Sequence, residues 1–213
     1  MTEISGQPVP KKQGNFDHIF YVLRANPVTL IAFGMFALLI FSAVFGPALV
    51  PYDPLATNAS ISLQAPSWEH WFGTDNVGRD VFSRVIVATR LDLSISVAAV
   101  VLSFIVGSVL GCIAGYWGGW LDIVLNRFLD TIMAFPLFVL AMGIVAALGN
   151  TIENIIYATA IINMPFYARL VRAEVNIRRD AGFARAAKLA GNSDVRVLAM
   201  HIFPNALPPM MVQ

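Results

Sequence analysis

The chain has 213 residues, of which 57% are apolar and only 13% are charged. Soluble domains carry about 25% charged residues, so this composition argues against a soluble globular protein. The net charge of +1 gives no basic excess for nucleic-acid binding, and the one cysteine, Cys112, can form neither an intrachain disulfide nor a cysteine-based zinc cluster.

The N-terminal region predicts a tail, a surface helix and then a membrane span. Residues 1–27 are expected to be a cytoplasmic tail that ends in a short interfacial helix, because apolar side chains recur at steps of three and four at Phe16, Ile19, Phe20 and Leu23. Residues 28–50 then contain no charged side chain. A helix of that length measures about 34 Å and can cross a hydrocarbon core of about 30 Å, so we expect it to be the first transmembrane helix.

Residues 51–92 are expected to form an external loop. They are net negative, and Trp68, Trp71 and Phe72 lie close together, as is common where a chain returns to the membrane interface. From Asp80 a helical pattern resumes, and the four-residue spacing predicts Asp75–Arg79 and Asp80–Arg84 ion pairs. An amphipathic lead-in to the next span and a contact surface for an external partner are both compatible with this loop.

Three further apolar runs predict spans at residues 93–116, 131–149 and 155–170. The first of these carries a ridge of small residues at four-residue spacing: Ala99, Ser103, Gly107, Gly111 and Gly115. Such a ridge lets two helix backbones approach closely in lipid, whether the partner helix belongs to this chain or to a second subunit. Pro136 and Pro165 can kink the later spans.

Taken together, these runs predict an all-α, polytopic membrane helix bundle with residues 93–213 as its core. A new apolar run at residues 206–212 is too short to cross a bilayer, so we expect a C-terminally truncated form of a longer chain. Eleven of the fourteen Lys and Arg residues lie on one side of this arrangement, together with the N-terminus. The positive-inside rule therefore predicts a cytoplasmic N-terminus.

The basic segment at residues 169–204 predicts a compact helical loop in the cytoplasm. The expected first helix has one face made of Phe183, Ala186, Ala187 and Ala190, with Arg185 and Lys188 on the other face. Gly191 is suited to end this helix, and Asp194 lies in the first turn of a second helix that is expected to stop at Pro204. On these features alone, the loop could dock into another protein or fold back on its own bundle.

Residues 185–205, Arg-Ala-Ala-Lys-Leu-Ala-Gly followed by nine residues and then His-Ile-Phe-Pro-Asn, resemble the EAA loop of importer-type ABC-transporter permeases. Arg185 stands where that family's Glu is usual and His201 where Ile is common, as in its dipeptide, oligopeptide and nickel branch. Residues 73–84 and 115–122 also resemble segments of that branch, and the three matches follow one another in the family's order.

The resemblance implies a type I ABC importer permease of the bacterial inner membrane, with about four to five of six expected spans present. It implies transport of peptides or related small solutes, or of nickel, delivered by an external binding protein. The implied partners are a paralogous permease subunit and two cytoplasmic ATPase subunits. The implied ATPase-docking residues are Arg185, Ala186, Ala187, Lys188, Gly191 and Asp194, with Pro204 and Asn205 as a loop hinge.

We expect no catalytic residue, cofactor or metal in this chain. It contains no Gly-x-x-x-x-Gly-Lys-Ser/Thr sequence to hold ATP phosphates, so the energy would come from a partner. An intramembrane enzyme would need catalytic groups at bilayer depth, but His18, His70 and His201 all lie outside the expected spans. The remaining alternative is a channel or structural membrane protein without an ATPase partner.

Overall fold

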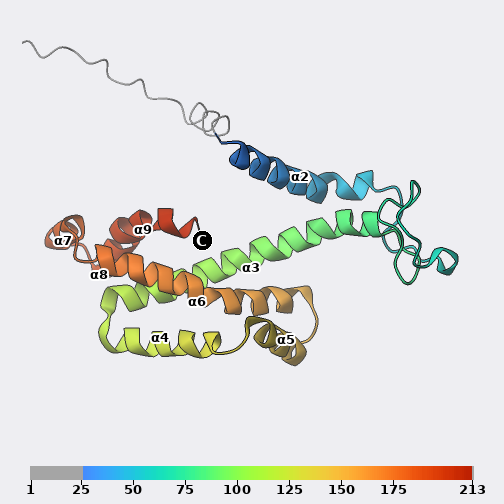
Figure 1. Ribbon diagram of the computed structural model, residues 1–213. Coiled ribbons are helices and arrows are strands. Elements are labelled where there is room, and N and C mark those ends of the chain that lie inside the picture. The colour runs from blue at the N-terminus through green and yellow to red at the C-terminus, as the bar shows by residue number, and fades with distance from the viewer. Residues whose placement is uncertain (1–25, 213) are drawn as a thin grey trace, which may run out of the picture. The chain divides into compact units, whose positions relative to one another are not determined.

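The computed structural model describes residues 26–212, so the expected tail and interfacial helix at residues 1–25 lie outside the described residues. The described chain consists of helices and connecting loops, which confirms the all-α prediction (Figure 1). It divides into two compact units between residues 91 and 92. The elements are α2 (Pro27–Leu49), η1 (Ala59–Ile61), α3 (Val81–Trp117), α4 (Gly119–Met133), α5 (Leu137–Leu148), α6 (Ile152–Arg178), α7 (Gly182–Leu189), α8 (Asp194–Val197), η2 (Leu198–Ile202) and α9 (Phe203–Met210).

Within residues 26–212, α2 and α3 are long and apolar enough to cross a membrane, and α4 with α5 would make a third span if the bent pair counts as one. Helix α2 corresponds to the expected first span. Its start is fixed by Asn26, whose side chain accepts a hydrogen bond from the Val28 N–H at 3.1 Å, and by Pro27 in the first turn. Helix α3 has 37 residues, so the expected second span and its lead-in form one continuous helix.

The expected third span, residues 131–149, is not one continuous helix, and the kink expected at Pro136 is a full break. The chain breaks between α4 and α5, and the two helices meet at 90°. Pro136 explains the break, because proline disfavours helical geometry in the residue before it and therefore stands at the start of α5. The expected fourth span lies within α6, which continues to Arg178 and is not among the helices of residues 26–212 that qualify by length and apolarity.

In the first unit, Asp75 organises the loop that precedes α3. Its carboxylate accepts hydrogen bonds from the backbone N–H groups of Val77 and Arg79, each at 3.0 Å, and it pairs with the guanidinium groups of Arg79, at 2.8 Å, and Arg84. Gly78 has a φ of +74°, and a Cβ there would lie 1.8 Å from the Asn58 carbonyl oxygen. The segment at residues 73–84 is therefore held in place by contacts within the first unit.

The predicted Asp80–Arg84 pair is wrong, because Asp80 caps helix α3 instead of lying within it. Its Oδ2 accepts the Ser83 N–H at 2.7 Å, and its Oδ1 accepts the Nδ1–H of buried His70 at 2.9 Å. Burial raises the pKa of Asp80, but the hydrogen bonds from Ser83 and His70 outweigh it and hold that pKa below the ordinary value of 3.8. Tyr52 packs on the His70 ring, with a centroid distance of 4.7 Å.

In the second unit, α6 lies alongside both the C-terminal half of α3 and helix α4 (Figure 1). The small-residue ridge of α3 faces α6: a Cβ at Gly111 would lie 2.4 Å from the Ala168 carbonyl oxygen. The partner helix that the sequence left open is thus α6 of the same chain. Helix α6 is also tied to α4, because Arg172 of α6 donates two hydrogen bonds to the carboxylate of Asp122 in α4.

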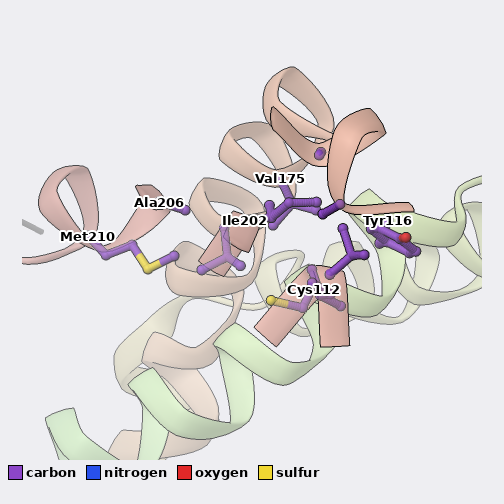
Figure 2. Packing of buried hydrophobic residues seen from close by; sticks show 11 residues of the cluster. Cys112, Tyr116, Val175, Ile202, Ala206 and Met210 are labelled. Atoms are coloured by element: carbon purple, nitrogen blue, oxygen red, sulfur yellow. The ribbon is translucent and has the colours of Figure 1, made fainter. Parts of the chain in front are cut away.

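The buried core of the second unit lies where α3 and α6 meet the last helices of the chain (Figure 2). Cys112 and Tyr116 come from α3 and Val175 from α6, and they pack with apolar residues of α7, α8, η2 and α9. These include Ala184, Ala187, Val197, Leu198, Ile202, Ala206 and Met210. The C-terminal helices therefore fold back onto the bundle and are anchored to both α3 and α6.

Candidate functional site

The short helix α7 begins after Ala181 and ends in a left-handed turn. Gly191 has a φ of +87°, the conformation expected of a residue that ends a helix, and its N–H donates to the Lys188 carbonyl oxygen at 2.9 Å. The Asn192 side chain donates to the Ala187 carbonyl oxygen, also at 2.9 Å. These contacts satisfy the last carbonyls of α7 and direct the chain into α8.

The inward face of α7 differs from the predicted one. Ala184 is fully buried and Ala187 is 9% exposed, and both pack in the core, three residues apart on one side of the helix. The predicted face is therefore wrong for Ala187, because that side chain is buried in the core, whereas Phe183, Ala186 and Ala190 are exposed. Leu189 is 90% exposed, so the outward surface of α7 carries both large apolar side chains of this helix.

Lys188 and Asp194, both expected to dock a partner, contact each other in this structure. Lys188 Nζ lies 3.0 Å from Asp194 Oδ1, and the same oxygen accepts the hydroxyl of Tyr116, in the last turn of α3, at 2.7 Å. The Tyr116 hydroxyl and Lys188 lower the pKa of Asp194, whereas Asp194 and Tyr116 raise the pKa of Lys188. Of the six expected docking residues, Ala187 is buried and the other five are exposed.

The expected loop hinge at Pro204 and Asn205 lies inside a helical segment. After α8 the chain widens into the π-helical turn η2, and Pro204 then lies in the first turn of α9, directly after that turn. The Asn205 side chain donates to the His201 carbonyl oxygen at 2.7 Å. The prediction that the second helix stops at Pro204 is therefore wrong.

The remaining feature of this site is the outward surface of α7. In the part of the chain that the structure describes, no three His, Cys, Asp or Glu side chains come together as a possible metal site. The outward surface of α7 combines Phe183, Ala186 and Leu189 with the guanidinium of Arg185. Together with the apolar helices α2 and α3, these features define a helical membrane protein in which a short amphipathic helix, α7, packs against the core.

Comparison with known proteins identifies the family. Residues 107–213 match the family described as "binding-protein-dependent transport system inner membrane component". Residues 16–66 match the "N-terminal TM domain of oligopeptide transport permease C". The chain therefore belongs to the binding-protein-dependent, ABC-type inner-membrane permeases and is a multi-pass membrane protein.

Several relatives cover most of the chain. The dipeptide transport system permease protein DppC of Alkalihalophilus pseudofirmus is 40% identical over 217 residues, which cover 100% of this chain and 71% of the relative. The probable D,D-dipeptide transport system permease protein DdpC of Escherichia coli K12 is 37% identical over 206 residues, which cover 96% of this chain and 69% of the relative. The glutathione transport system permease protein GsiD of Pectobacterium atrosepticum is 35% identical over 184 residues, covering 85% and 61%. These names support peptide transport and give nickel no support.

Sequence reasoning missed the contacts that fasten α7 and α6 to the bundle. Tyr116 and Asp194 are 78 residues apart, and Asp122 and Arg172 are 50 residues apart, so no local spacing predicts either pair. One signal was present: Tyr116 and Asp122 both lie in residues 115–122, one of the segments that resemble the permease branch.

Proposed function

We propose that this chain is the translocating subunit of an ATP-driven importer for small peptides. It accepts its substrate from an external binding protein and works with a paralogous permease subunit and two cytoplasmic ATPase subunits. The peptide class is supported by the relatives, which are named for dipeptides, D,D-dipeptides and glutathione. The N-terminus is cytoplasmic in this proposal, because eleven of fourteen basic residues then lie inside.

One observation supports the ATPase contact above all others: the outward surface of α7 is apolar. Leu189 is 90% exposed and Phe183 is 43% exposed, although α7 is only eight residues long and lies in the most basic segment of the chain. Covering such side chains with a partner is favourable, since burial of apolar area is worth about 25 cal/mol per Å². The matching surface on the partner is a groove with an apolar floor, and an acidic rim would suit Arg185.

The transport mechanism follows from how α7 is held. Its inner face belongs to the same core cluster as Tyr116 of α3 and Val175 of α6 (Figure 2), so the force that a partner applies to α7 passes to both helices. ATP binding that closes the ATPase pair would favour one arrangement of the bundle and hydrolysis the other. A ligand can shift such an equilibrium only through its different affinity for the two states.

Co-purification tests this proposal. The chain is expressed with its candidate ATPase subunits, purified through a tag on the chain, and assayed for bound ATPase. We expect Leu189→Asp to remove the ATPase while membrane insertion stays intact. The matched control is Leu55→Asp, because Leu55 is a 76% exposed leucine in the expected external loop. Retention of the ATPase by Leu189→Asp would contradict the proposed docking surface and favour a channel or a structural protein.

A further inference from the structure

Three side chains meet between α7 and the end of α3: Tyr116 from the last turn of α3, Lys188 from the last turn of α7, and Asp194 from the start of α8. Each touches the other two. Asp194 Oδ1 accepts the Tyr116 hydroxyl at 2.7 Å and lies 3.0 Å from Lys188 Nζ, which in turn lies 5.1 Å from the centroid of the Tyr116 ring. We call this group the α7 clasp.

The clasp is fixed on the side of the bundle. Tyr116 is 8% exposed and belongs to the core cluster, and a tyrosine ring has few conformations, so its hydroxyl is a fixed anchor. The neighbouring Gly115 lies against α6, where a Cβ would approach the Arg172 carbonyl oxygen at 2.7 Å. The end of α3 that carries the anchor is therefore packed tightly on α6.

Apart from the clasp, α7 is held weakly in position. The side chains that it buries are the methyl groups of Ala184 and Ala187, which are small and give no direction to the contact. Short connecting segments join α7 to α6 and to α8, at residues 179–181 and 190–193. A charge-assisted hydrogen bond has a preferred geometry, which contact between methyl groups lacks. Arg179, in the connection before α7, also donates to the Gly115 carbonyl oxygen of α3 at 3.1 Å. The clasp is thus a directional contact between α7 itself and α3.

We propose that Tyr116, Lys188 and Asp194 are positioning residues that couple the displacement of α7 to α3, so that ATP hydrolysis by a docked partner drives transport. This inference rests on the proposed function and adds the element that transmits the motion. It also assigns Lys188 and Asp194 a role within the chain, while Leu189 and Phe183 contact the partner.

Tyr116→Phe is the decisive variant. It removes one hydroxyl and keeps the buried ring, and because Tyr116 is buried, the change leaves the outward surface of α7 as it was. A partner contact by Lys188 or Asp194 would survive this substitution, whereas the clasp loses its hydrogen bond. The matched control is Tyr167→Phe, which takes a hydroxyl from another buried tyrosine of the same unit.

The experiment uses the assembled transporter in proteoliposomes, with its binding protein and radiolabelled dialanine as the probe. Uptake, ATP hydrolysis and bound ATPase are measured on the same preparation. We expect Tyr116→Phe and Lys188→Met to keep the ATPase bound and hydrolysing. The uptake per ATP hydrolysed should fall roughly tenfold, which is the factor that corresponds to the loss of one hydrogen bond to a charged group. Lys188→Arg and Tyr167→Phe should keep the uptake per ATP hydrolysed at the wild-type value.

Two results would overturn the clasp: unchanged uptake per ATP in Tyr116→Phe, or a parallel loss of bound ATPase and uptake, which would mean a structural role only. If the wild type binds no ATPase, the proposed function fails by itself. The clasp is then decided by amide hydrogen exchange of α7 in the purified chain. Tyr116→Phe should speed that exchange roughly tenfold, and an unchanged rate would refute the clasp.

Discussion

The contact between α3 and α6 is tight enough that one methyl group at Gly111 should disturb it. A Cβ at this position would lie 2.4 Å from the Ala168 carbonyl oxygen, 2.8 Å from the Val171 Cβ and 3.0 Å from the backbone nitrogen of Arg172. Ordinary contact begins at 3.4 Å, so the helices would have to separate by about 1 Å, the difference between 3.4 and 2.4 Å. These three atoms are backbone atoms or a Cβ, so none can rotate away.

The expected magnitude for Gly111→Ala follows from two opposing effects. Overpacking of this kind costs about 1–3 kcal/mol. Alanine also favours the helix by about 1 kcal/mol relative to glycine. The net change should therefore be a loss of unfolding free energy of up to about 2 kcal/mol.

Gly143→Ala in α5 is the matched control, because no atom lies within 4 Å of a Cβ at that position. This variant should be as stable as the wild type or up to about 1 kcal/mol more stable. Both variants are unfolded by titration with a denaturing detergent in micelles, followed by circular dichroism. Equal stability of Gly111→Ala and Gly143→Ala would refute the close approach of α3 and α6.

Two further predictions concern α7 and the loop before α3. Ala187→Trp should lower the thermal midpoint, because it enlarges a side chain of the core. Ala186→Trp should leave the midpoint unchanged and weaken ATPase co-purification, because Ala186 is exposed. The reverse pattern would mean that Ala186 is on the buried face of α7 and Ala187 on the outward surface. The pKa of Asp80 is lowered in the fold, so its ionised form stabilises the loop above the ordinary value of 3.8, and this stabilisation is lost as the pH falls through the folded pKa. The difference in thermal midpoint between the wild type and Asp80→Asn should therefore shrink in a pH series taken below 3.8, and a constant difference would contradict this role.

Features with a local cause could be predicted from the sequence. The uncharged run at residues 28–50 agrees with α2 to within one residue at each end, and Gly191 adopts its left-handed turn. The ridge of small residues indicated a close helix contact, although periodicity alone could not name α6 as the partner. Each of these depends on neighbours within a few turns of the same helix.

Features that depend on distant residues could not be predicted. The prediction for α7 is wrong at Ala187 because two alanine-rich faces were available to the core. Ala184 and Ala187 are the buried ones, in one cluster with Val197 and Ile202 of the following helices. Asp80 has Arg84 at a favourable spacing but instead bonds to His70, because it caps α3 rather than lying inside it. In both cases tertiary contacts outweigh local spacing.

In the proposed function, this chain moves peptides inward when an ATPase acts on α7. Its most direct test is uptake of labelled dialanine by proteoliposomes that contain the chain with its proposed partners, with and without ATP. We expect accumulation above the external concentration only when ATP and the binding protein are both present, and we expect Leu189→Asp to abolish it. Uptake that merely equilibrates, needs no ATP and survives Leu189→Asp would show a channel and contradict the account.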